Sequence, residues 1–231
     1  MSVEQIQPAR ASPLPDEFLP PNCGFAVQDW PVLARQWFPV SRIEEVTAQP
    51  RQVSLLDLRL AIYRMTDGIR IGRDMCPHRG LPLSTGRIDG DQLVCAYHGL
   101  RFGADGQCRK IPEKLALKPA ACFRLAMFPV VERHGLVWTC LIPQGEPRIP
   151  EILSEVDASD PGEIASEIAS AIQLHLEAWM SLEEFDFSHA AATTDSNHDI
   201  SLRVLALNEY RRLFDAMGLA TFASALPAFT A

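Results

Sequence analysis

The sequence predicts an α+β protein in which an antiparallel, all-β domain precedes a partial, mixed α+β C-terminal region. Short apolar or alternating runs, separated by Gly/Asp turns, fill residues 36–143, as in compact antiparallel domains. Residues 144–163 are dominated by proline, glycine and acidic side chains, and the hydrophobic pattern changes after them. We therefore expect a proline-rich arm at 1–35, the β domain, a linker at 144–163 and a short region at 164–231.

Four runs carry the strand prediction, and a turn signal borders each of them. The runs are residues 52–65, 68–75, 91–102 and 135–143. The turns between or beside them read "TDG", "IDGD", "ADGQ" and "ERHG". Gly and Asp tolerate the backbone conformations that tight turns need, so this spacing predicts many short strands.

The C-terminal region combines one strand-like run with two helical signals. Residues 171–178 alternate apolar and polar side chains through Ile172, Leu174 and Leu176, which predicts a strand. Ser181 precedes Glu184 by three residues, the spacing of a capping box, so we expect a helix to begin there. A further helix is expected at about residues 202–217.

Composition and charge narrow the function classes. The chain has 231 residues, a formal net charge of −8 and a pI of about 5.2, which disfavours binding to nucleic acid or anionic membranes. No uncharged apolar run approaches the ~18 residues of a membrane span, and the N-terminus lacks the apolar core of a secretory signal. We expect a cytoplasmic protein with reduced thiols, in which paired cysteines and histidines indicate a metal site rather than disulfides.

Two similar pentapeptides, "CPHRG" at 76–80 and "CAYHG" at 95–99, form the first candidate site. Cys76 and His78 are followed after sixteen residues by Cys95 and His98. Two thiolates and two imidazoles suit either a zinc ion or a two-iron, two-sulfide cluster with mixed Cys and His ligation. The Cys-x-His spacing is not that of a zinc-finger knuckle, and no finger helix follows, which favours the cluster.

These pentapeptides resemble the Rieske domain of the non-haem iron ring-hydroxylating oxygenases. Segments similar to those of that family also occur at "WFPV" (37–40), "RFGADGQC" (101–108) and "GLVWTCLIP" (135–143). The resemblance implies a [2Fe–2S] cluster with Cys76 and Cys95 on one iron and His78 and His98 on the other.

Details within the two motifs indicate the subtype. Gly80 and Gly99 are expected to let backbone N–H groups approach the cluster sulfurs. Respiratory-chain Rieske proteins carry an extra cysteine in each loop, and the two form a disulfide. Leu81 and Tyr97 stand at those positions here, so no such bridge forms, and we expect a potential toward the low end of the Rieske range.

A second candidate site lies in "WMSLEEFDFSHAAATTDSNHD". Glu183, Asp186 and His189 are spaced to share one helix face. The stretch resembles the catalytic helix of the same oxygenases. It implies that Asp186 bridges a Rieske histidine to a mononuclear Fe(II), and that His189 is the first ligand of this iron. Glu183 stands where the family has Asn.

The second site departs from the family pattern in two ways. Thr194 occupies the position of the second histidine, and the nearest substitute is His198. The family's carboxylate ligand comes from a later helix, which does not occur before Ala231. Three readings stay open: a shortened domain without competent iron, a half-domain completed by a partner chain, and iron bound atypically by Asp186, His189 and His198.

The resemblance implies an oxidoreductase that hydroxylates or demethylates a small, aromatic substrate with dioxygen. An NAD(P)H-dependent flavin or ferredoxin reductase would supply the electrons. A homotrimer or a complex with a full-length oxygenase paralogue would be the assembly. The alternative is a Rieske electron-transfer protein or supporting subunit without a competent mononuclear iron site.

Overall fold

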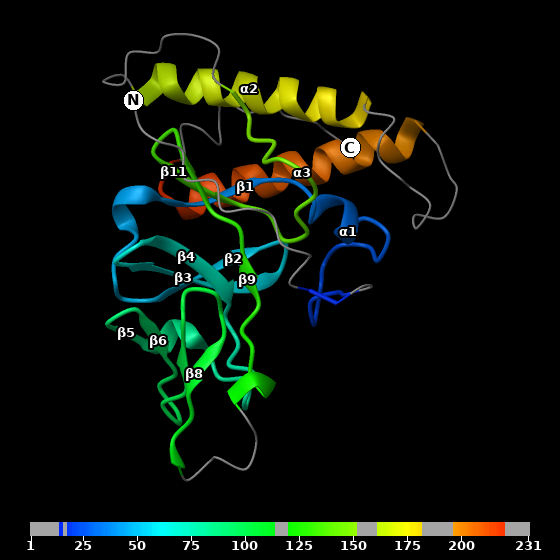
Figure 1. Ribbon diagram of the computed structural model, residues 1–231. Helices are drawn as coiled ribbons and strands as arrows, with labels where there is room; N and C mark the ends of the chain where they lie inside the picture. The colour runs from blue at the N-terminus through cyan, green and yellow to red at the C-terminus, as the bar shows by residue number, and fades with distance from the viewer. Residues whose placement is uncertain (1–13, 16–17, 114–119, 152–160, 182–195, 220–231) are drawn as a thin grey trace. The chain divides into compact units, whose positions relative to one another are not determined.

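The computed structural model describes residues 14–15, 18–113, 120–151, 161–181 and 196–219, and the chain folds as two units (Figure 1). Unit 1 comprises the described residues up to Gly24 together with Ala34–Pro147. Unit 2 comprises Phe25–Leu33 and the described residues from Arg148 onward. Every strand described belongs to unit 1, whereas the long helices belong to unit 2.

Unit 1 contains three antiparallel sheets. The first has the order β1 (Phe38–Arg42), β11 (Leu136–Thr139), β10 (Val131–Arg133). The second has the order β2 (Arg51–Leu55), β3 (Leu58–Met65), β4 (Gly68–Arg73), β9 (Met127–Phe128). The third has the order β5 (Arg87–Asp89), β6 (Gln92–Val94), β7 (Arg101–Phe102), β8 (Cys108–Lys110). The antiparallel β domain predicted from the turn spacing is confirmed.

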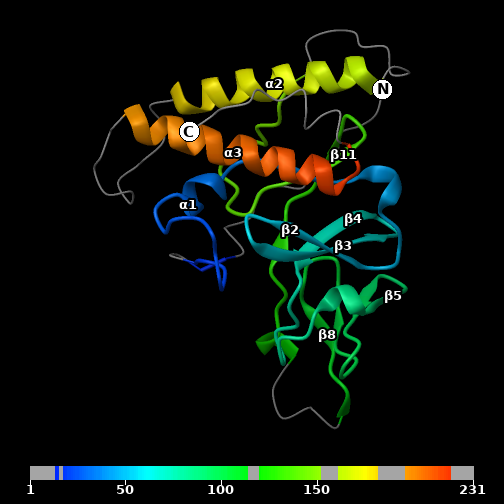
Figure 2. The same cartoon turned by 180° about the vertical axis from the view of Figure 1, so that it is seen from behind.

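The second sheet lies between the other two, as both views of the ribbon show (Figures 1 and 2). Its strand β3 is buried along most of its length because it pairs with β2 on one side and β4 on the other. The predicted run 52–65 divides at Leu56 and Asp57, which have φ of 47° and 64°. Two consecutive residues with positive φ make the tight hairpin turn that matches the twist of paired strands.

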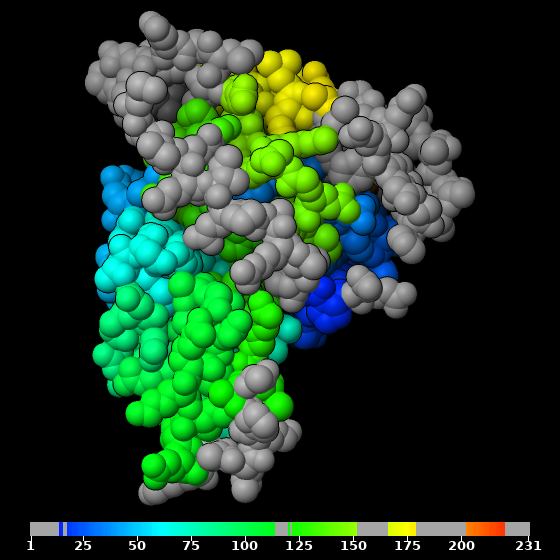
Figure 3. Space-filling view, viewed as in Figure 1, coloured from blue at the N-terminus to red at the C-terminus, as the bar shows by residue number. Residues whose placement is uncertain are grey.

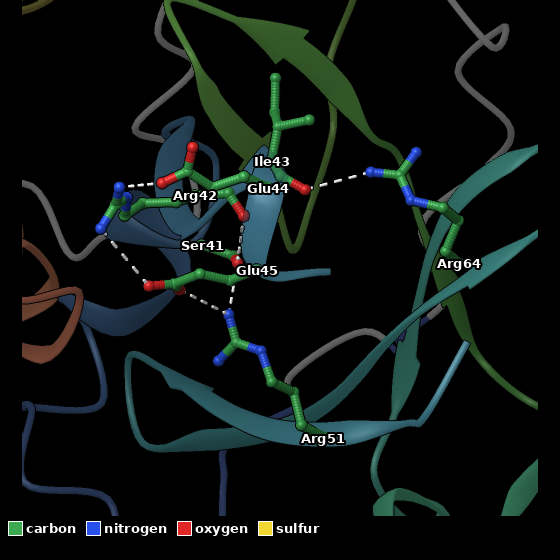
Figure 4. Close-up of polar contacts among 7 residues, drawn as sticks. All are labelled: Ser41, Arg42, Ile43, Glu44, Glu45, Arg51 and Arg64. Atoms are coloured by element: carbon green, nitrogen blue, oxygen red, sulfur yellow. Dashed lines mark hydrogen bonds and ion pairs between the residues drawn. The ribbon is translucent and has the colours of Figure 1, made fainter. Parts of the chain in front are cut away.

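A polar network ties the first sheet to the second (Figure 4). Arg64 of β3 donates to the carbonyl oxygens of Ile43 (3.1 Å) and Val46 (3.0 Å), on either side of the turn that follows β1. Arg51 of β2 pairs with Glu45 at 3.3 Å in the short helix η1 (Ile43–Glu45). The network therefore holds this connection at the end of unit 1 opposite the third sheet.

Unit 2 contains α1 (Trp30–Leu33), α2 (Pro161–Ser181) and α3 (Ser196–Ala216). The strand predicted at 171–178 is wrong, because these residues belong to α2. Ile168, Ile172 and Leu176 are buried at a spacing of four, while Leu174 is 58% exposed. The alternation covered only three residues, and the helical period over the longer window prevailed.

The ends of α2 bear on two further expectations. Ser181 is the last described residue of α2, and the helix that the capping box predicts after it lies outside the described residues, so that expectation stays a prediction. Pro161, placed in the expected linker, begins α2, where a proline costs no hydrogen bond. The helix predicted at about 202–217 is confirmed as α3, which begins earlier, at Ser196. Within the part of the chain that the structure describes, none of the helices combines the length and apolarity needed to cross a membrane.

Candidate iron–sulfur site

The first loop, residues 76–81, is closed by two backbone hydrogen bonds. The Cys76 N–H donates to the Leu81 carbonyl at 2.8 Å, and the Gly80 N–H donates to the Cys76 carbonyl at 2.8 Å. Gly80 has a φ of 76°, a conformation that side chains with a Cβ rarely adopt. The loop thus turns the chain sharply between Cys76 and Leu81.

The second loop, residues 95–100, repeats the same backbone plan. The Cys95 N–H donates to the Leu100 carbonyl at 2.9 Å, and the Gly99 N–H donates to the Cys95 carbonyl at 3.0 Å. Gly99 has a φ of 69°. The glycine is the fourth residue after the cysteine in both loops, whereas the histidine is the second in one and the third in the other. The similarity of the two pentapeptides is therefore a similarity of backbone.

The two cysteines meet in the interior. Cys76 and Cys95 are both buried, and their side chains hydrogen-bond to each other. Backbone N–H groups of His78 and Arg79 donate to the Cys76 sulfur, and those of Tyr97 and His98 donate to the Cys95 sulfur. The loops therefore direct four N–H dipoles at two sulfurs, as thiolate ligands of a buried cluster require.

The two histidines meet nearer the surface. The Nδ1 atoms of His78 and His98 lie 3.1 Å apart, and both side chains are partly exposed. Two nitrogens bound to one metal have such a separation, because metal–nitrogen bonds are ~2.1 Å long. The donors thus group as a sulfur pair and a nitrogen pair, and no three His, Cys, Asp or Glu of the described residues surround a single ion site. This grouping fits two metals with two protein ligands each.

The electrostatics of the two pairs favour the metal-binding protonation states of Cys95 and His78. The hydrogen bond from Cys76, followed by those from the backbone N–H groups of Tyr97 and His98, lowers the pKa of Cys95 to about 6. The same Cys95 contact, together with burial, raises the pKa of Cys76. Desolvation, then the charges of His98 and Arg79, lower the pKa of His78. A thiolate and a neutral imidazole are the forms that bind metals.

Comparison with known proteins bears on the same residues. The sequence profile of the Rieske [2Fe-2S] domain matches residues 36–125, which include both loops. The oxygenase component of dicamba O-demethylase from Stenotrophomonas maltophilia is 38% identical over 129 residues, covering 55% of this chain and 34% of that protein. The oxygenase subunit of vanillate O-demethylase from Pseudomonas sp. (strain HR199 / DSM 7063) is 26% identical over 179 residues, covering 73% of this chain and 49% of that protein. Residues 36–125 therefore match a Rieske [2Fe-2S] domain, and the chain is similar to oxygenase components that contain one.

The chain spans about a third to a half of the length of these relatives. A crystal structure of dicamba monooxygenase bound to 3,6 dichlorosalicylic acid is 36% identical, with a TM-score of 0.45. That alignment covers 57% of this chain and 35% of the other.

An apolar core surrounds the sulfur side of the Rieske site. It is formed by buried side chains from β3, β6, β7 and the loops, among them Tyr63, Leu83, Leu93, Leu100 and Phe102. Such a shell keeps water from the sulfurs and lowers the local dielectric, which tunes the potential of a cluster. On the histidine side, the ring of Phe123 meets His78 edge-on at 5.6 Å and that of Tyr97 lies 3.7 Å from His98, centroid to centroid.

A buried carboxylate that sequence reasoning missed supports the first loop. Asp74 is 1% exposed and accepts hydrogen bonds from the Ser84 backbone N–H (2.7 Å) and hydroxyl (2.8 Å). Ser84 lies in the short helix η2 (Leu83–Thr85), directly after the loop. The carboxylate therefore clamps both ends of the first loop together. No sequence motif marks this pair, because the two residues are ten positions apart.

The remaining cysteines form no disulfide, and Cys108 and Cys140 are buried. Burial raises the pKa of each of these two thiols, so both stay protonated.

The residues predicted for a mononuclear iron are not brought together by the described part of the chain. Glu183, Asp186, His189 and Thr194 lie outside the described residues. His198 lies near the start of α3, in a segment whose backbone alone is described. The assignment of iron to Asp186, His189 and His198 therefore stays a prediction.

Proposed function

We propose that this chain acts in a Rieske oxygenase system that hydroxylates or demethylates a small, aromatic substrate. The observation that carries the proposal is the pair of matched loops, which gathers two cysteine sulfurs and two histidine nitrogens inside a Rieske domain. Two relatives whose names specify O-demethylation support the reaction class.

The four candidate ligands would each bind one of the two irons of the cluster. Cys76 and Cys95 would hold one iron of the [2Fe–2S] cluster in the apolar core, and His78 and His98 would hold the other near the surface. When bound, the cluster stores one electron at a time, which dioxygen activation requires. The imidazole edges are the exposed part of the site, so they provide the route by which electrons enter and leave.

The proposed partners follow from this division. An NAD(P)H-dependent flavin or ferredoxin reductase would deliver electrons, because the relatives are themselves named as the oxygenase parts of larger systems. Asp186 would connect a Rieske histidine with a mononuclear Fe(II), and His189 with His198 would ligate that iron.

A second candidate is a Rieske electron-transfer protein or supporting subunit that lacks a competent mononuclear site. Thr194 favours it, because threonine stands where the family's catalytic helix has its second histidine. The two candidates predict different metal contents, since only the first includes an iron outside the cluster.

Iron counting on the protein purified without oxygen separates the candidates. With a Rieske electron paramagnetic resonance signal after dithionite reduction, three irons per chain would support the oxygenase, and two would support the carrier. His189→Ala should lower three irons to two, while His134→Asn, in the exposed turn before β11, should leave the count unchanged. Absence of both the signal and the iron would overturn both candidates.

A further inference from the structure

Charge is distributed unevenly between the Rieske loops and the rest of the chain. Residues 76–125 contain eight Lys and Arg and four Asp and Glu, a net charge of +4. The remaining residues contain thirteen Lys and Arg and twenty-five Asp and Glu, a net charge of −12. A cationic segment in a protein with a net charge of −8 is thus confined to the part that carries the candidate cluster.

Three of these cations lie in the loops or in segments that contact them. Arg79 directly follows His78 in the first loop and is exposed. Arg124 follows Phe123, whose ring meets that of His78. Lys110 pairs in register with Arg101, the residue after the second loop. Two residues beyond Lys110, Pro112 lies 3.9 Å from where a Cβ on Gly99 would be.

These three cations are not neutralised within the described part of unit 1. Two carboxylates of the segment are already occupied, because Asp89 pairs with Arg101 at 2.7 Å and Asp105 pairs with Arg109 at 2.9 Å. Arg79, Lys110 and Arg124 are exposed and form no ion pair with any described carboxylate. Their charge is therefore available to a partner.

An exposed aromatic ring completes this surface. Tyr97 is 57% exposed, and it is one of three large hydrophobic side chains exposed in the described residues. Its ring covers that of His98 at 3.7 Å. Tyrosine and arginine are enriched where proteins contact each other, and lysine adds long-range attraction. Figure 3 shows that the strands after the loops, in green, form one continuous surface at this end of unit 1.

We propose that Arg79, Tyr97, Lys110 and Arg124 form a docking surface for an electron-donor protein whose own one-electron centre is surrounded by acidic residues. The inference rests on the proposed electron-transfer function and adds the charge of the partner. One electron leaves the reduced donor, which is oxidised, and reduces the two-iron cluster by one electron, while no covalent bond forms or breaks. Docking over His78 and His98 makes this path short.

The docking surface and the net charge of the protein predict opposite effects of added salt on the binding of an acidic partner. A protein with a net charge of −8 repels an acidic partner, and added salt then strengthens binding by screening the repulsion. If the docking surface governs the encounter, added salt weakens binding instead. The sign of the salt dependence therefore decides between local and overall charge.

The test measures binding of an acidic, oxidised plant-type [2Fe–2S] ferredoxin to the cluster-loaded protein by titration calorimetry. With both proteins oxidised no electron moves, so the readout is independent of turnover. We expect the Kd to rise about tenfold or more as ionic strength increases from about 0.02 M to about 0.3 M. A Kd that is constant or falls with salt, or no binding at low salt, would overturn the docking surface.

Two sets of variants locate the effect. The triple variant Arg79→Glu, Lys110→Glu, Arg124→Glu should raise the Kd at low salt about tenfold and abolish its salt dependence. The matched control Arg79→Lys, Lys110→Arg, Arg124→Lys keeps every charge and should retain both. Equal Kd values for the two triple variants would contradict the proposal.

A second measurement separates the docking surface from the proposed function. Iron and sulfide near two each per chain establish the cluster in every variant, and their absence from the unaltered protein would refute the function itself. With the cluster present, reduction by the methyl viologen cation radical should accelerate with salt and reduction by the dithionite-derived radical anion should slow. The reverse signs would leave the function standing and overturn the docking surface.

Discussion

The first loop follows Asp74 and Met75, whereas the second loop joins two strands that pair with each other. Both loops have the same two closing hydrogen bonds and a glycine with positive φ at the same place. The first is anchored by the Asp74 carboxylate, which accepts two hydrogen bonds from Ser84. The second is anchored by β6 and β7, in which Leu93 pairs with Phe102.

The backbone conformation of each ligand loop and the contacts that hold the loop in place have different origins. Each loop takes its shape from hydrogen bonds within six residues and from a glycine, so a short sequence can specify it. Its anchorage depends on whatever the fold places nearby, a buried carboxylate in one case and a strand pair in the other. Because the two loops share a backbone conformation, substitutions within them should have similar effects on stability. Substitutions at their anchors should have different effects, because the anchors differ.

Loss of either cysteine should have the largest effect. Cys76→Ser and Cys95→Ser should each abolish the visible absorbance of the cluster and its acid-labile sulfide, because serine is a poor ligand for iron in such a cluster. Cys108→Ser is the matched control, since Cys108 is buried in the same core. If one of the two loop variants kept its colour, the two loops would not be equivalent.

Removal of the anchoring carboxylate should affect the first loop selectively. Asp74→Ala should lower the free energy of unfolding by about 2 kcal/mol, because two hydrogen bonds to a buried charged group are lost. Thr85→Ala removes an exposed hydroxyl from the same short helix η2 and should cost much less. Urea unfolding measures both changes, and similar costs for the two variants would show that Asp74 does not anchor the loop.

The two loop glycines should respond alike to a methyl group. Gly80→Ala and Gly99→Ala should each cost about 1 kcal/mol of unfolding free energy, because alanine disfavours positive φ. The new Cβ would lie 4.0 Å from Met75 Cγ or 3.9 Å from Pro112 Cγ, so neither site adds a clash. Gly90→Ala, at φ 59° in open space, should cost the same without altering the cluster spectrum. Unequal costs in the two loops would contradict their shared backbone plan.

The smallest effect is expected at the exposed ring of the second loop. Tyr97→Ala should change the unfolding free energy by less than about 0.5 kcal/mol, because a mostly exposed side chain loses little buried area. Phe123→Ala, at the less exposed ring beside His78, should cost more. Thermal unfolding compares the two, and a larger cost at Tyr97 would mean that its contact with His98 supports the loop.

Much of the Rieske site could be predicted because its information is local. The two pentapeptides contain the sulfur and nitrogen donors, and they contain Gly80 and Gly99, which were expected to let backbone N–H groups approach the sulfurs and which have positive φ. The Asp74 contact with Ser84 could not be predicted, since it joins residues that only folding brings together. The strand expected at 171–178 is wrong, because that prediction relied on three alternating residues, whereas the longer stretch has the period of a helix.

By itself the sequence determined the chemistry of the ligand loops, their turns and the antiparallel character of the strands around them. These features depend on residue type and on spacings of a few positions, which the chain carries whatever its fold. Only the tertiary structure decided that the sulfurs meet in the core while the imidazoles meet nearer the surface. It also decided that Lys110 lies opposite Arg101, the residue after the second loop, because strand pairing sets which distant residues become neighbours.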